Sequence, residues 1–310
     1  MDYQEFTKRV EEEILSFMPE KYAESEVKIE RVTKNNGVEK CGLTIRYDDK
    51  RCVPVLYLEE FYDEFREVEN DGNFIRIMGS IASAYEFSEA QGDKFVSPRD
   101  IIDFEKIKDK IVPRVVNYEN NPELLSDRPY KRFLDLAITY IIEVESNTDG
   151  MYCTAVINEM LDHYGVDLDT IHELAISNMK RINPPLIMPI HEYIGIGDCD
   201  DDDTPVLEPL PYIISNTGRI NGCSQILNTD ALDNAVEKIG SDILIIPAST
   251  REMILLPVEC IEQYDMLKQY LEDVNNMDGM VEEILSYNIY SYDSTSKQVD
   301  FAEKLLSERV

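Results

Sequence analysis

The sequence predicts an α+β protein in which helices pack on antiparallel sheets, divided into two subdomains. Stretches with helical spacing and stretches with strand alternation follow one another along the chain. The strand candidates come in sequential pairs joined by turn residues, which is typical of antiparallel sheets. The chain has 310 residues, 43% of them hydrophobic. Because single cores stop growing near roughly 250–300 residues, we expect the apolar residues to form two cores.

The N-terminal part begins with an amphipathic helix and continues as a hairpin. Apolar residues recur at helical spacing from Phe6 to Phe17. The period then changes to two on either side of Asn35-Asn36-Gly37, a turn whose residues favour positive φ. The apolar run Cys52–Leu58 predicts a third strand. Helices are expected over 61–68, 74–87 and 98–107.

The middle of the chain predicts a strand, a short helix, a second hairpin and a longer helix. These elements are expected at 111–118, 121–125, 133–157 and from Thr170 to Asn183. The start at Thr170 rests on the capping box formed by Thr170 and Glu173.

From Pro184 to Leu210 prolines recur and no period is sustained, so this stretch predicts a divider. The expected domains are 1–190 and 211–310, with an acidic, proline-rich divider at 191–210. Beyond it we expect a helix ended by Gly240, a hairpin formed by DILIIP and EMILLPV, a helix near 261–271 and a last strand near 289–292.

The charge balance limits the classes of partner. The chain carries 62 acidic and 30 basic residues, a net charge of −32. A field of that sign repels phosphate backbones and anionic lipids, so we expect no direct nucleic-acid or membrane binding, whereas a basic protein is admissible as a partner. The alternative is that the acidity only favours solubility. The N-terminus has no signal-peptide pattern, and the six cysteines form no C-x-x-C pair. We therefore expect a cytoplasmic protein with reduced thiols and no transmembrane segment.

Several long phrases resemble those of a known family. They are FMPEKY, VTKNNGV, PVLYLEEFY, KDKIVPRVVNYENNPELLSDRPY, INEMLDHYGVDLDTIHELAISN and NTGRINGCSQIL followed by KIGSDILIIPASTREMILLP. These phrases are similar to those of a family of uncharacterised bacterial proteins, a domain of unknown function. The resemblance covers most of the chain and implies a folded, cytoplasmic α+β protein. It carries no activity, cofactor or site residue to this sequence.

The run Gly195–Asp203 holds five aspartates but does not match a metal or phosphate site. Read as an EF-hand from Asp198, it has Asp203 where the sharp turn needs glycine and Pro209 where a bidentate glutamate belongs. Its glycines lack the remaining residues of a dinucleotide or P-loop motif. We expect a hydrated loop, and the sequence predicts no metal and no cofactor.

Zinc and nucleophile signatures are also incomplete. His163, His172 and His191 lie apart and none extends to H-E-x-x-H. Gly222-Cys223-Ser224 begins like a nucleophile elbow, but Ile226 replaces its final glycine. We expect a turn that enters a strand there.

The remaining site candidate is the segment Ser249, Thr250, Arg251 and Glu252, which joins two apolar strands. A loop at the end of a rigid sheet can present a hydroxyl, a guanidinium and a carboxylate to a ligand or partner. The alternative is a polar turn with a local Arg251–Glu252 pair. No catalytic residue is assigned.

We therefore hypothesise a protein-binding or regulatory module rather than an enzyme. One alternative is a hydrolase or metal-dependent enzyme with carboxylates from separate segments, since such sites need no local motif. A second alternative is an acidic inhibitor that mimics nucleic acid, which requires rows of acidic side chains on one face. The oligomeric state stays open.

Overall fold

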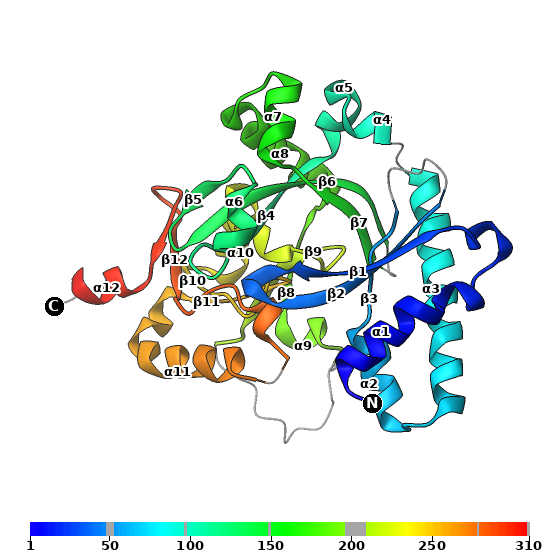
Figure 1. Ribbon diagram of the computed structural model, residues 1–310. Helices are drawn as coiled ribbons and strands as arrows, with labels where there is room; N and C mark the ends of the chain where they lie inside the picture. Colours follow the sequence, from blue (N-terminus) through cyan, green and yellow to red (C-terminus); the bar gives the residue numbers. More distant parts are fainter. Residues whose placement is uncertain (48–52, 96–97, 148–149, 196–208, 278, 309–310) are drawn as a thin grey trace. The chain divides into compact units, whose positions relative to one another are not determined.

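The computed structural model describes residues 1–47, 53–95, 98–147, 150–195, 209–277 and 279–308. By its contacts the chain forms two compact units, Met1–Phe104 (unit 1) and Glu105–Val310 (unit 2) (Figure 1). Each unit combines helices with antiparallel strands, so the α+β prediction is confirmed. Among the described residues, no helix is both long and apolar enough to cross a bilayer.

Unit 1 contains a three-stranded sheet in the order β1-β2-β3. The hairpin turn has φ of 57° at Asn36 and 71° at Gly37, as the sequence predicts. The first helix begins with a capping box in which Asp2 and Glu5 each accept the other's backbone N–H. The elements of unit 1 are α1 (Tyr3–Glu13), η1 (Ile14–Phe17), η2 (Glu20–Tyr22), β1 (Glu26–Thr33), η3 (Asn35–Gly37), β2 (Glu39–Arg46), β3 (Leu56–Tyr57), α2 (Glu59–Glu67), α3 (Asp71–Phe95) and α4 (Pro98–Ile101).

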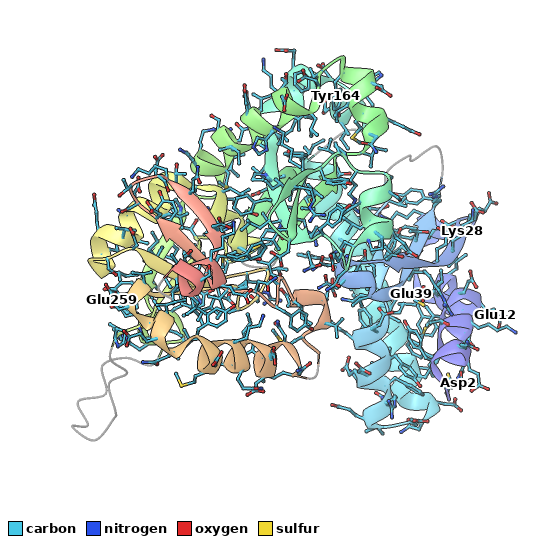
Figure 2. All side chains as sticks on the ribbon, turned by 90° about the vertical axis from the view of Figure 1, so that its left-hand side faces the viewer. Asp2, Glu12, Lys28, Glu39, Tyr164 and Glu259 are labelled. Carbon is cyan, nitrogen blue, oxygen red and sulfur yellow. The ribbon has the colours of Figure 1, made fainter. Side chains whose placement is uncertain are left out.

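The core of unit 1 lies where α1, α2 and α3 cover one face of this sheet. Phe6 of α1 contacts Phe65 and Phe74 with ring centroids 5.6 and 6.0 Å apart. Tyr85 of α3 donates its hydroxyl to the carbonyl of Ile45 and accepts from the N–H of the same residue, which fixes the helix on β2. Figure 2 shows charged side chains on the outside of each unit, including the exposed Glu12 of unit 1 and Glu259 of unit 2.

Unit 2 contains two antiparallel sheets. The larger has the strand order β13-β12-β10-β11-β9-β8, and in the smaller β4 and, on its other side, β5 and β7 pair with β6. The elements are α5 (Phe104–Ile107), η4 (Lys108–Lys110), β4 (Ile111–Asn117), α6 (Pro122–Ser126), β5 (Lys131–Phe133), β6 (Leu136–Asn147), β7 (Gly150–Ala155), α7 (Asn158–Tyr164), α8 (Leu168–Ile182), β8 (Pro185–Pro189), α9 (Ile190–Tyr193), β9 (Tyr212–Asn216), η5 (Gly222–Leu227), α10 (Thr229–Ile239), β10 (Ile243–Ile246), β11 (Met253–Pro257), η6 (Val258–Gln263), α11 (Tyr264–Asn275), η7 (Val281–Glu283), β12 (Tyr290–Asp293), β13 (Gln298–Phe301) and α12 (Glu303–Glu308).

The central hairpin of the larger sheet is buried on both faces. Alternate residues of β10, Ile243 and Ile245, face the core that contains Leu232 of α10. Leu244 and Ile246 face the second core, which contains Leu267 and Leu271 of α11. Because both faces are covered, β10 and β11 are continuous apolar runs rather than alternating ones. The predicted hairpin is confirmed.

The free edge of β4 is closed by side chains. Its outward carbonyls belong to Ile111, Pro113 and Val115, and they accept hydrogen bonds from Asn178 (3.0 Å), Ser224 (3.3 Å) and the Cys223 thiol (3.8 Å) respectively. Pro113 lies at an outward position, where no strand needs its missing N–H. This edge therefore joins the smaller sheet to α8 and η5 instead of exposing unpaired groups.

The predicted divider 191–210 joins β8 to β9, which pair in one sheet. The strand PLIMP begins at Pro185 and ends at Pro189. Because proline is rare in strands, the sequence does not predict a strand there. The division that the contacts give lies between 104 and 105, where the chain passes from the core of unit 1 to β4. Most of 191–210, including the aspartates of Gly195–Asp203, lies outside the described residues.

Two element boundaries differ from prediction. Helix α8 begins at Leu168, and its N-cap is Asp167, whose carboxylate accepts the N–H of Thr170 at 2.8 Å. Thr170 is therefore a first-turn residue and not the N-cap, because its own N–H donates to the side chain of Asp167. The segment after Cys223 is the 3₁₀ helix η5, and not a turn entering a strand.

The exposed edge of β8 is protected against pairing. Thr217 donates to the carbonyl of Pro184 and Ile190 to that of Pro211, so residues 185, 187 and 189 point their backbone groups away from β9. Pro185 and Pro189 have no N–H, and Lys238 donates to the outward carbonyl of Ile187 at 3.2 Å. Of these three outward positions, only Ile187 keeps an N–H.

We predict that replacing Pro185 and Pro189 by Thr, together with Lys238→Ala, increases self-association, because the edge then offers a full set of backbone donors and acceptors. Sedimentation velocity over a concentration series should show a higher mass than the wild type. Pro19→Thr with Lys8→Ala, outside any sheet edge, is the control. Unchanged mass in a folded triple variant would contradict the prediction.

Candidate functional site

The predicted segment Ser249–Glu252 links β10 to β11 and folds as a tight turn. Ser249 donates its hydroxyl to Glu252 Oε1 at 2.7 Å and its N–H to the Glu252 carbonyl at 3.1 Å. The same hydroxyl accepts the N–H of Arg251 at 3.0 Å. Glu252 also accepts the hydroxyl of Tyr193 at 3.0 Å. These bonds fix the turn within unit 2.

The ion pair in this turn is not the local one that the sequence suggests. Arg251 binds Glu283 through Nε at 3.2 Å and Nη2 at 2.9 Å. Thr250 donates its hydroxyl to the other Glu283 oxygen and its N–H to the Glu283 carbonyl. The guanidinium is 61% exposed whereas Glu283 is 25% exposed. Of the pair, Arg251 is therefore the more accessible to a partner. The hydroxyls of Ser249 and Thr250 already donate hydrogen bonds within the turn or to Glu283.

The turn packs on Gly222, where no larger residue fits. A Cβ there would lie 2.1 Å from the Arg251 carbonyl and 2.2 Å from Ser215 Oγ. In the native arrangement Ser215 donates to that carbonyl at 2.7 Å, and Cys223 donates its N–H to the Thr250 carbonyl at 3.2 Å. The motif Gly222-Cys223-Ser224 therefore fastens the turn to the edge of β4.

The cysteine of this motif is unsuited to nucleophilic chemistry. Burial raises the pKa of the Cys223 thiol to about 12, so it stays protonated at neutral pH. Its neighbour Ser224 uses its hydroxyl as a donor to the Pro113 carbonyl. Both side chains thus act in packing.

The three histidines remain separate. His172 contacts the Tyr140 hydroxyl through Nδ1 at 3.0 Å, and burial, with a smaller contribution from Lys131, lowers the pKa of its ring. Across the described residues, no three His, Cys, Asp or Glu side chains gather in a group that could hold a metal ion.

Sequence reasoning missed a hollow in unit 1 with a volume of about 440 Å³. Its residues come from α1, β1, β2 and the start of α2. Glu59 Oε1 accepts both the Tyr3 hydroxyl and the Cys41 N–H at 2.6 Å, while its Oε2 is buried without a hydrogen-bond partner among the described residues. Burial, then the bond to Glu59, raises the pKa of Tyr3, which keeps the phenol a donor. Tyr3 and Glu59 are 56 positions apart, so no local pattern joins them.

A third feature is the outer side of α11. Met266 and Tyr270 are 60% and 50% exposed, and Met277, just beyond the helix end, is 61% exposed. Leu267 and Leu271, each one position further along α11, point into the core. Single exposed apolar residues are ordinary, whereas several close together are found at interaction surfaces more often.

The fold and these sites define an acidic, two-unit α+β protein that exposes apolar side chains on α11 and just beyond its end. The chain belongs to the family of unknown function DUF5688, whose model matches residues 3–294. The expected membership of a domain of unknown function is thereby confirmed. No curated protein and no solved structure gives a significant match.

We predict that Gly222→Ala lowers the free energy of unfolding by about 1–3 kcal/mol, because the added Cβ forces the turn off Ser215. Gly79→Ala is the control, since nothing lies within 4 Å of its Cβ in α3. That change should raise stability by up to about 1 kcal/mol. Urea denaturation of both variants measures the difference, and equal effects would refute the steric argument.

We also predict a pH dependence from His172. Its folded-state pKa is lowered, so the unfolded chain takes up a proton first as the pH falls below about 6.5, and stability declines from there. His172→Gln should lose less stability between about pH 7.5 and 5.5 than the wild type. Thermal unfolding over that range tests this, with His191→Gln as the histidine control. An equal decline in all three proteins would contradict the assignment.

Proposed function

We propose that the protein is a binding module for a basic partner and that the outer side of α11 is the contact surface. The stripe of Met266, Tyr270 and Met277 carries this proposal. Met266 and Tyr270 are four positions apart in α11, so their side chains lie about 40° apart on one side of the helix, and Met277 follows just beyond the helix end. Methionine and tyrosine suit such a surface because they are adaptable or amphipathic.

The charge around the stripe favours a cationic occupant. Between residues 259 and 287 the sequence has eight acidic residues and one lysine, a net charge of −7. Asp273 lies between Tyr270 and Met277 on the same side of the helix, and both Asp265 and Asp273 are exposed. An amphipathic basic helix matches this combination, with its apolar face on the stripe and its cations toward the acids.

The size of the surface indicates a transient complex. Three principal side chains form a contact at the low end of the range for specific interfaces, which typically corresponds to weak, exchangeable binding. A regulatory module fits this behaviour better than an obligate subunit. A charge-only contact, as in a nucleic-acid mimic, would need no apolar stripe, and this difference separates the two functions.

We predict that a synthetic amphipathic helix of Leu and Lys binds the full chain and that Met266→Ser with Met277→Ser weakens it about tenfold, since central apolar anchors dominate binding energy. Ile75→Ser with Phe87→Ser, which removes exposed apolar groups from α3 of unit 1, is the matched control. Isothermal titration calorimetry measures both.

Two further peptides sharpen the test. A scrambled peptide of the same composition lacks an apolar face, and a Glu-for-Lys peptide reverses the charge. Binding of the scrambled peptide as tight as that of the helix, abolished by salt, would support the charge-only mimic instead. Equal binding of the acidic peptide, or no binding of any, would refute the proposed function.

A further inference from the structure

In and beside the smaller sheet of unit 2, two arginines are poorly paired among the described residues although the chain is acidic: Arg114 has no carboxylate partner, and Arg128 has only Asp127 at 3.7 Å. Arg114 lies on β4 opposite Thr139 of β6. Arg128 lies in the connection between α6 and β5. Neither residue is part of the α11 surface.

The two arginines reach the same stretch of β6. Thr139 donates its hydroxyl to the Arg114 carbonyl at 3.0 Å. The residue before Arg128, Asp127, accepts the N–H of Asn158 at 2.8 Å, and the nearby Val156 donates to the carbonyl of Tyr140. With the pairing of Lys131 and Ile138, these bonds bring the backbone before β5, which includes Arg128, near the part of β6 that pairs with Arg114.

Arg128 is poorly compensated. Its side chain is only 20% exposed, and its Nε is buried without a hydrogen bond in the described structure. The adjacent Asp127 lies 3.7 Å away, too far for a hydrogen bond, and is itself 65% exposed. A buried cation is costly unless a counter-charge binds it.

Arg114 increases this cost. Within the described residues its guanidinium donates no hydrogen bond and pairs with no carboxylate. Burial is the main cause that lowers the pKa of Arg128, and repulsion by Arg114 is the second. The two like charges are therefore close enough to destabilise each other, in a chain with 62 acidic residues available to neutralise them.

We propose that Arg114 and Arg128 form a site for a small tetrahedral oxyanion, with inorganic phosphate as the simplest occupant. Guanidinium groups present planar pairs of donors that match oxyanions, and two of them can bind different oxygens of one anion. The anion satisfies the orphan Nε and cancels the repulsion. The net charge of −32 opposes its approach, but that field is screened beyond about 8–10 Å, where the two local cations dominate.

The test follows thermal unfolding of the full chain in increasing phosphate, with sodium chloride holding the ionic strength constant. The midpoint should rise with phosphate in the wild type, since a ligand that binds only the folded state stabilises it. Arg114→Gln and Arg128→Gln should abolish the rise. Arg132→Gln, an exposed arginine on the same sheet that stacks on Tyr118, should keep it.

A second readout separates a site from a structural role. Without phosphate, Arg114→Gln should be as stable as the wild type or more so, because it removes the repulsion. If Arg128→Gln fails to fold, the phosphate dependence of the unfolding midpoint of Arg114→Gln alone tests the proposal. The proposal is overturned if phosphate and chloride give the same midpoint, if acetate acts as strongly as phosphate, or if Arg114→Gln responds like the wild type. Line broadening of the phosphate ³¹P signal, lost in the same variants, should agree.

Discussion

The structure of unit 2 depends on the burial of both faces of the β10–β11 hairpin. Each of its strands sends alternate side chains into two separate cores, one under α10 and one under α11. Because burying each Leu or Ile side chain contributes roughly 1.5–3 kcal/mol, this strand pair anchors the larger sheet. The core under α10 continues into Val115 and Leu136, so it also holds the smaller sheet.

The open edges of the sheets are managed by different means. At β8, two prolines remove two outward N–H groups and a lysine satisfies one outward carbonyl, whereas at β4 the side chains of Asn178, Cys223 and Ser224 bind outward carbonyls. The β4 solution also fixes η5, which in turn requires the bare backbone of Gly222 against the Ser249–Glu252 turn. The segment Ser249–Glu252, which the sequence suggests as a site, is thus held in place by its packing against Gly222.

The surplus of acid shapes both proposals in opposite ways. In the proposed binding module, the acids around α11 would select a cationic partner for the apolar stripe. In and beside the smaller sheet, Arg114 has no carboxylate partner among the described residues and Arg128 has only Asp127 at 3.7 Å, so the proposed anion would bind their remaining donors. The two surfaces use different residues and different ligands, so each can be tested without the other.

The sequence by itself determined the elements whose signals are local. The first helix with Phe6 and Val10, the Asn36-Gly37 turn, the end of α10 at Gly240 and the apolar hairpin follow from spacing and backbone preference within a few residues. Tertiary structure alone decided the pairing of β8 with β9, the Arg251–Glu283 pair and the Tyr3–Glu59 bond. These depend on contacts between residues far apart in the chain, and such contacts leave no period or motif in the sequence.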